Sequence, residues 1–141
     1  MQHKLTREEE LLFESCKAGN RNAALIYMAH VSDIDVRCVE GWTPLIVASY
    51  NGFTDIIVDL ITHGANVNAT NRNGTSVLMY AKSAAVRTGD YSGMDVLLEH
   101  KADPYHRDLY GKTIFDYAKT INDSILLSYL SLKMNRKNNL D

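Results

Sequence analysis

Apolar residues in the middle of the chain recur at the spacing of an α-helix. Leu45 and Ala48 form one such set, and Ile57, Leu60 and Ile61 form a second set shortly after it. Apolar positions three or four residues apart indicate a helix with one buried face. The pattern therefore predicts two short helices in succession, each with its apolar side turned toward a shared core.

Turn and capping residues lie where these two helices would begin and end. Thr43 is a favourable N-cap, and Pro44 after it occupies the first helical position, where a backbone N–H is not needed. Gly52 and Gly64 follow the two apolar sets, at positions where a helix often ends in the left-handed conformation. These local signals predict a helix–turn–helix unit.

The unit occurs more than once. Similar segments begin at Gly41, Gly74 and Gly111, at spacings of 33 and 37 residues. A degenerate copy precedes them, because Gly19 lies 33 residues before Gly52. Since one unit cannot bury its apolar face alone, we expect the copies to stack around a continuous core. Their approximate boundaries are 6–37, 38–70, 71–107 and 108–134.

A period of 33 with Thr-Pro-Leu opening a helix at Thr43 resembles the ankyrin repeat. The segment from Gly41 to Gly52 and the His-Gly-Ala-Asn sequence at His63 match the consensus of that family almost position for position. The resemblance implies an all-α solenoid of stacked helix–turn–helix units with short β-turn or hairpin connectors. We expect residues 1–134 to form one ankyrin-repeat domain and residues 135–141 to form a flexible tail.

The first and third copies depart from the pattern in ways that carry structural expectations. The longer spacing places four additional residues around Ala84 to Gly93, where we expect a surface loop. That loop is either neutral or a partner contact through Tyr91. Val31 and Lys101 occupy the column of Gly64. A left-handed conformation at a non-glycine residue costs about 1–2 kcal/mol, unless the turn there is reshaped.

Composition and charge narrow the function classes. Hydrophobic residues make up 45% and charged residues 23% of the chain, as in a globular domain. The net charge of -2 provides no basic field for nucleic acid or anionic lipid. No apolar run approaches the ~20 residues of a membrane span, and the first residues are too polar for a signal peptide. Cys16 and Cys38 make no disulfide framework. We therefore expect a cytoplasmic protein that binds neither nucleic acid nor membrane.

No catalytic motif stands out. Gly-Lys-Thr at Gly111 imitates the end of a phosphate-binding loop, but no upstream glycine lies at the required distance. No serine occupies a Gly-x-Ser-x-Gly turn. We expect no enzymatic activity and no cofactor.

Three histidines share the column at the end of each outer helix: His30, His63 and His100. One interpretation is a metal- or ligand-binding protein that uses this column together with His106. However, stacked helices lie roughly 8–10 Å apart, whereas two imidazoles on one zinc each lie about 2.0–2.1 Å from it. The column is more typical of a cation at a helix C-terminus, where the helix dipole stabilises it. We therefore expect no metal site.

The resemblance implies a partner-binding surface on the concave face, made of connector tips and exposed inner-helix positions. Trp, Tyr and Arg are enriched at interface hot spots, whereas Tyr27, Tyr80 and Tyr117 fall in core columns and are expected to pack. Trp42 and Tyr110 have an alternative role, packing against neighbouring tips. The expected partner-binding residues are Glu40, Trp42, Tyr50, Arg72, Asn73, Met79, Leu109, Tyr110 and Lys112, with Tyr91 from the insertion.

These observations predict a non-enzymatic protein-interaction module, monomeric when free. From the size of the chain we expect one dedicated protein partner, as for an inhibitor, immunity or escort protein. The small metal- or ligand-binding protein remains the alternative. Nucleic-acid binding is disfavoured, because it would need a concave face dominated by Arg37, Arg72, Arg107 and Lys112.

Overall fold

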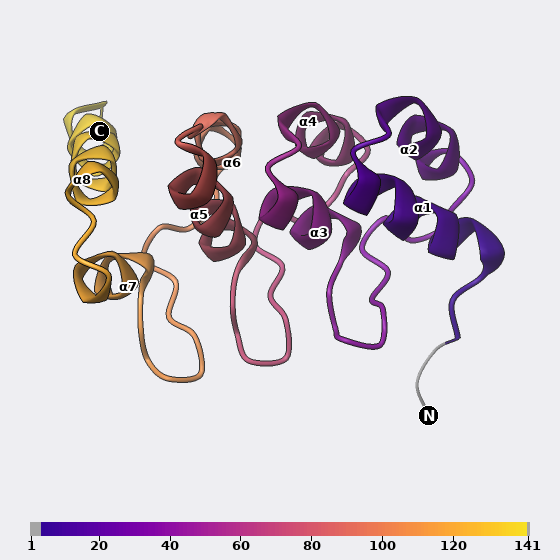
Figure 1. Cartoon of the computed structure of the whole chain (residues 1–141), viewed down its shortest axis with the longest axis horizontal. Coiled ribbons are helices and arrows are strands. Elements are labelled where there is room, and N and C mark those ends of the chain that lie inside the picture. Colours follow the sequence, from indigo (N-terminus) through magenta and orange to yellow (C-terminus); the bar gives the residue numbers. More distant parts are fainter. Residues whose placement is uncertain (1–3, 141) are drawn as a thin grey trace.

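The computed structural model describes residues 4–140, with side chains through residue 134. This part of the chain folds into four pairs of helices stacked in a row, with the two ends of the chain at opposite ends of the row (Figure 1). The helices are α1 (Arg7–Ala18), α2 (Arg21–Met28), α3 (Pro44–Asn51), α4 (Thr54–Thr62), α5 (Val77–Thr88), α6 (Ser92–Glu99), α7 (Ile114–Thr120) and α8 (Ser124–Leu140). The all-α solenoid expected from the sequence is confirmed.

Hydroxyl side chains cap the first helix of every pair. Each accepts a hydrogen bond from the backbone N–H three residues later, which satisfies one of the donors left open at a helix start. The oxygen-to-nitrogen distances lie between 3.1 and 3.3 Å. The capping residues are Thr6, Thr43, Ser76 and Thr113. The inner helices α1, α3, α5 and α7 therefore begin where the repeat places a Thr or Ser.

Three hairpin-like connectors project from the same side of the row (Figure 1). In each one, the backbone N–H of the first residue donates to the carbonyl four residues later at 3.0 Å; these donors are Cys38, Asn71 and Asp108. A glycine with positive φ completes each turn, at Gly41, Gly74 and Gly111. The connectors and the inner helices together form one surface, which we call the inner face.

The core is continuous through the stack. Leu12, Leu45 and Leu78 are 33 residues apart and at most 1% exposed, and the small Ala48 and Ala81 let neighbouring inner helices approach closely. The buried apolar residues of successive repeats therefore belong to one shared core. Repeats of this kind stabilise each other by stacking.

Polar contacts join the outer helices. The Arg21 guanidinium of α2 bonds both carboxylate oxygens of Asp59 on α4, at 2.8 and 3.1 Å. Asp95 on α6 accepts from the Tyr129 hydroxyl at 2.6 Å and pairs with Lys133 at 2.8 Å, both on α8. The first and last helix pairs are thus tied to their neighbours by carboxylates.

The four additional residues of the third repeat lie within a helix. α5 has 12 residues and α3 has 8, so the insertion adds about one helical turn before the left-handed Gly89. The expected surface loop is therefore wrong. Tyr91 lies at the start of α6, and its ring packs against Tyr129 with centroids 4.6 Å apart. This contact lies within the stack, between the start of α6 and α8.

The two non-glycine residues in the column of Gly64 behave differently. Lys101 has a φ of 72° and occupies the left-handed conformation, as Gly64 does with 93°. Val31 is not among the described residues with positive φ. Its backbone N–H bonds the carbonyl of Tyr27 at 3.1 Å, and the turn after α2 has a different shape.

α8 extends to Leu140, but side chains of residues 135–141 lie outside those that the structure describes, so the predicted flexible tail stays a prediction.

Among the described helices, none combines the length and apolarity that crossing a membrane requires.

Candidate protein-binding surface

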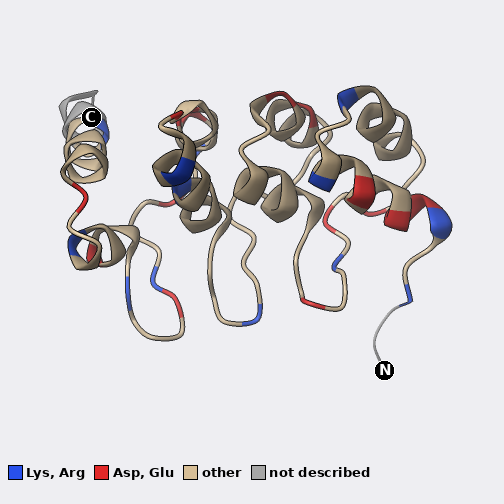
Figure 2. Ribbon diagram, in the orientation of Figure 1, with Lys and Arg blue, Asp and Glu red and all other residues tan. Residues whose placement is uncertain are grey.

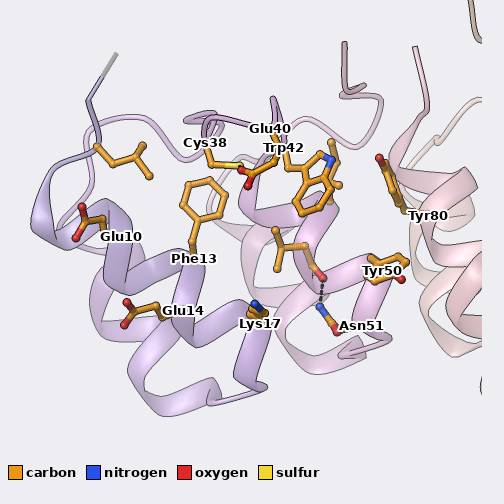
Figure 3. Close-up of a pocket in the computed structure, with 13 residues that line it drawn as sticks. Glu10, Phe13, Glu14, Lys17, Cys38, Glu40, Trp42, Tyr50, Asn51 and Tyr80 are labelled. Carbon is orange, nitrogen blue, oxygen red and sulfur yellow. Dashed lines mark hydrogen bonds between the residues drawn. The ribbon is translucent and has the colours of Figure 1, made fainter. Parts of the chain in front are cut away.

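A groove of about 610 Å³ opens on the inner face between α1, α3 and the first connector, with one residue of α5 at its end (Figure 3). We call it the α1–α3 groove. Its lining is mostly apolar and aromatic, with three carboxylates and one ammonium group. The lining residues are Leu5, Glu10, Phe13, Glu14, Lys17, Cys38, Glu40, Trp42, Ile46, Val47, Tyr50, Asn51 and Tyr80.

One face of α1 supplies a wall of the groove. Glu10, Phe13, Glu14 and Lys17 follow the three- and four-residue spacing of a single helical stripe. The opposite stripe, which includes Leu12 and Cys16, is buried in the core. The helix is therefore two-sided, and its groove side combines one large ring with charged groups (Figure 3).

Three aromatic rings line the other end of the groove. The ring of Tyr80 lies edge-on to Trp42 at 6.4 Å between centroids and edge-on to Tyr50 at 6.0 Å. Asn71 donates to the Tyr80 hydroxyl at 2.7 Å and fixes the central ring. Trp42 and Tyr50 nevertheless remain 36% and 47% exposed. Trp42 thus packs against the next repeat, which is one of its two expected roles, and keeps part of its ring in solvent; its contact with a partner stays a prediction.

The later repeats close the corner between connector and inner helix with a tyrosine. Tyr80 is tied to Asn71, nine residues before it, and Tyr117 donates to the carboxylate of Asp108, again nine residues before it. In both cases the ring spans the corner, and the Asn or Asp side chain also accepts backbone N–H bonds of its own connector. Both tyrosines pack against the core, as expected.

In the second repeat the same two positions are Cys38 and Val47. Neither side chain can span the corner, and both line the α1–α3 groove. The hollow is therefore explained by one pair of small residues in a column that otherwise holds a tyrosine and its polar partner.

Cys38 and Glu40 interact at the connector side of the groove. The Cys38 thiol donates to a Glu40 carboxylate oxygen at 3.0 Å. Burial raises the pKa of the thiol, and the hydrogen bond to Glu40 raises it further. The same bond lowers the pKa of Glu40, with smaller contributions from the positive charges of Arg72 and Lys17. At neutral pH the site therefore holds a protonated thiol and a carboxylate, which is not the state of a nucleophilic cysteine.

The structure brings together three of the residues expected to bind a partner: Glu40, Trp42 and Tyr50 all line the groove. Arg72 and Asn73 are exposed on the next connector, and Arg72 packs against Gly41, with its Cγ 3.0 Å from where a Cβ would lie. These five residues occupy adjacent parts of the inner face.

The remaining candidates lie elsewhere. Leu109 and Tyr110 are 72% and 73% exposed at the last connector, together with the exposed Lys112, and none of them lines the groove. Met79 is only 4% exposed, so its expected exposure is wrong. It lies in the first turn of α5, where the Ser76 cap directs the helix start into the core cluster.

Sequence reasoning missed the contribution of the first repeat. Leu5, Glu10, Phe13 and Glu14 were not among the expected residues, because the first copy is degenerate and has no Gly-x-Thr connector of its own. The available signal was the stripe of Glu10, Phe13, Glu14 and Lys17 opposite the buried positions of α1. A large ring on an otherwise charged helical face indicates a second contact surface.

The histidine column shows the geometry of helix ends. The Nδ1 atoms of His30, His63 and His100 lie 2.7 to 2.8 Å from the carbonyl four residues earlier in their own helices. His106 instead bridges two connectors, with Nε2 2.6 Å from the Gly74 carbonyl. Within the described part of the chain, no group of three or more potential ligands is placed to hold a metal ion.

Arg37 and Arg107, two of the residues considered for nucleic-acid binding, donate hydrogen bonds to backbone carbonyls of the connectors. Arg37 donates to the carbonyl of Gly41 at 2.7 Å and to that of Thr70 at 2.5 Å. Arg107 donates to the carbonyl of Gly111 at 2.7 Å. These two guanidinium groups hold connector carbonyls in place.

Comparison with known sequences identifies the family. A family model described as ankyrin repeats (3 copies) matches residues 11–108, well over half of the chain. The chain belongs to the ankyrin-repeat family, in agreement with the helix pairs, the connectors and the period of the sequence.

Curated relatives share parts of this chain. Protein phosphatase 1 regulatory subunit 27 of Homo sapiens is 38% identical over 63 residues, which cover 45% of this chain and 41% of the relative. BCL-6 corepressor-like protein 1 of Homo sapiens is 31% identical over 113 residues, covering 79% of this chain and 6% of the relative. Neurogenic locus notch homolog protein 1 of Danio rerio is 35% identical over 100 residues, covering 57% and 4%. The chain spans less than half the length of each of these relatives.

Proposed function

We propose that this chain is a non-enzymatic protein-interaction module that binds a protein partner through its inner face, centred on the α1–α3 groove. Ankyrin repeats are modules of protein–protein interaction, and two relatives are named a regulatory subunit and a corepressor-like protein. The proposal concerns where on this chain the partner docks.

The exposed aromatic cluster carries the proposal. Trp42 and Tyr50 keep a third to a half of their surface in solvent while Tyr80 holds both rings in place. Large rings that are fixed before binding contribute much contact area at little cost in side-chain entropy. Because these rings border an apolar groove, a partner side chain inserted there would be surrounded on several sides.

A narrower role follows from the form of the groove. A recess of this size is suited to one partner segment at a time, which supports a dedicated partner rather than a scaffold that assembles several. We propose accordingly an inhibitor, immunity or escort role for a monomeric chain in the cytoplasm. Leu109, Tyr110 and Lys112, and the tip residues Arg72 and Asn73, would then extend the contact beyond the groove.

The test is affinity capture from the cell of origin with the full chain as bait. We expect a specific partner to be retained by the wild-type chain and lost, by on the order of tenfold or more, when Trp42→Ala and Arg72→Ala are combined. Val58→Ala is the matched control, because Val58 is also an exposed apolar residue but lies on the outer helix α4.

Thermal unfolding of each bait separates binding from folding. We expect the Trp42→Ala/Arg72→Ala chain to stay folded, with a small decrease in Tm because the contact of Trp42 with Tyr80 is lost. Equal retention of the same partner by all three baits would contradict the proposal. So would a Trp42→Ala/Arg72→Ala chain that is unfolded at the capture temperature, because Trp42 and Arg72 would then be structural residues.

A further inference from the structure

The charges that border the α1–α3 groove are predominantly negative. Glu10 and Glu14 lie on α1, Glu40 lies on the connector opposite, and Lys17 is the only cation among the lining residues (Figure 3). All three carboxylate-bearing residues are exposed. The carboxylates therefore lie beside the apolar surface, where a bound segment would meet them without burying them completely.

The inner face changes sign along the stack. Lys and Arg occupy α5 and the tip of the second connector, whereas Asp and Glu lie in the middle of α1, between Arg7 and Lys17 near its two ends, and at the tip of the first connector (Figure 2). Arg72 and Arg87 are exposed, and Arg87 lies over the ring of Tyr50 at 5.5 Å. The acidic region is therefore confined to the α1 end of the groove, next to a basic neighbour.

The apolar part of the groove accepts a bulky side chain. Phe13 projects from α1 toward Cys38 and Glu40 (Figure 3), and Val47 lies on the α3 side. The corner that a tyrosine fills in the next two repeats is left open here. A side chain of similar size, supplied by a partner, would restore the packing that Tyr80 and Tyr117 provide in their own repeats.

We propose that the α1–α3 groove binds a protein segment in which a large apolar side chain is flanked by Lys or Arg. This inference rests on the proposed function and specifies the chemistry of the partner at that site. The apolar side chain enters the corner beside Val47, and the cations meet Glu10, Glu14 and Glu40. An acidic or phosphorylated segment would instead face three carboxylates, which disfavours it.

A peptide selection tests this chemistry directly. The immobilised full chain is exposed to a phage library of random peptides, and the enriched peptides are synthesised with a fluorescent label. We expect the enriched sequences to combine an aromatic or long aliphatic residue with neighbouring Lys or Arg. Their binding should weaken as salt is added, because exposed charge pairs are screened.

Charge reversal on α1 is the decisive variant. Glu10→Lys combined with Glu14→Lys should weaken binding of the labelled peptides on the order of tenfold, since each exposed pair contributes a small free energy and reversal replaces attraction with repulsion. Glu8→Lys is the matched control: Glu8 is exposed on the same helix but does not line the groove. It should leave binding unchanged, and thermal unfolding confirms that each variant is folded.

A third variant tests the open corner itself. Cys38→Asn with Val47→Tyr rebuilds the pair found at Asn71 and Tyr80 and should close the groove. We expect it to abolish peptide binding while the chain stays folded.

The outcomes separate this inference from the proposed function. Enrichment of acidic or uncharged peptides, absence of any enrichment, or binding that survives the charge reversal would overturn the inference. If Cys38→Asn/Val47→Tyr prevents capture of the cellular partner while Glu10→Lys/Glu14→Lys does not, the proposed function stands and the inference fails. If neither affects capture and Trp42→Ala/Arg72→Ala does not either, both fail.

Discussion

Lys101 and Gly64 end equivalent outer helices with the same backbone conformation but different side chains. Both have positive φ, at 72° and 93°. A side chain with a Cβ is strained in this region, whereas glycine is not. Space around the turn is not the constraint, because no heavy atom lies within 4 Å of a Cβ built at Gly64. The difference between the two repeats is therefore a backbone strain that one of them carries.

Lys101→Gly should relieve this strain. We expect the free energy of unfolding to rise by about 1 kcal/mol, measured by urea denaturation. The hydrogen bond from Asn68 to the Lys101 carbonyl uses the backbone and is retained. Gly64→Ala should lower the free energy of unfolding by a similar amount. A Lys101→Gly chain that is less stable than the wild type would show that the lysine side chain contributes more than the backbone strain costs.

The column of Gly64 also shows what the sequence can predict at single residues. The period correctly identified Lys101 and Val31 as positions where glycine is missing. It could not decide between a strained left-handed residue and a reshaped turn, and the structure contains one of each. The choice depends on the hydrogen bonds that follow each helix, which the repeat pattern does not specify.

At the scale of helices, the inner helix of the third repeat is longer than its neighbours. The additional turn of α5 places Arg87 beside α3, where its guanidinium donates to the Tyr50 carbonyl at 3.0 Å and lies over the Tyr50 ring. The expected loop followed from a rule about insertions in repeat proteins. The local composition favoured a helix instead, because the inserted region contains two alanines and an arginine before Gly89.

Leucines between the helices should dominate stability. Leu45 on α3 and Leu60 on α4 are fully buried, at 0% exposed. We expect Leu45→Ala or Leu60→Ala to lower the free energy of unfolding by about 2–5 kcal/mol, through lost burial and the cavity left behind. Ile125→Ala on α8 serves as the control, because Ile125 is 70% exposed. A loss below about 1 kcal/mol for both leucine variants would contradict this assignment of the core.

Helix starts, hairpin connectors and core columns were predictable because each depends on residues close together in the sequence. The groove was only partly predictable. Glu40, Trp42 and Tyr50 were expected on the inner face, but the depth beside Cys38 and Val47 was not. The groove is deep there because no tyrosine fills the corner. The sequence alone does not show this, since the role of the tyrosine follows from the hydrogen bond between Asn71 and the Tyr80 hydroxyl.

At the scale of the whole molecule, the stack has two different ends, and the main helix contacts among the described residues join helices of the same or of neighbouring pairs. The closing helix α8 is held to α6 through Asp95, which bonds Tyr129 and Lys133. In a linear array each repeat is stabilised by its neighbours, so an end repeat has one supporting interface and an internal repeat has two. The terminal helix should therefore open more readily than the centre.

Asp95→Ala should show this difference in local stability between the terminal helix and the centre. Its loss removes two contacts to α8, and we expect backbone amides of residues 124–134 to exchange severalfold faster, for a loss of about 1 kcal/mol. Amides of α3 and α4 should keep their protection. Hydrogen–deuterium exchange followed by mass spectrometry measures both regions at once. A uniform increase along the chain would show that the stack unfolds as one unit and that α8 has no separate opening.

The open corner beside Val47 also limits the positions along the array at which a ligand can bind. A repeat array is nearly the same after every shift of one repeat, so a ligand that recognised only shared features could bind in several shifted positions. The replacement of the tyrosine and its polar partner by Val47 and Cys38 occurs in one repeat and breaks that translational symmetry. It therefore marks one position along the array, and any segment that needs the hollow has a single alignment with the chain.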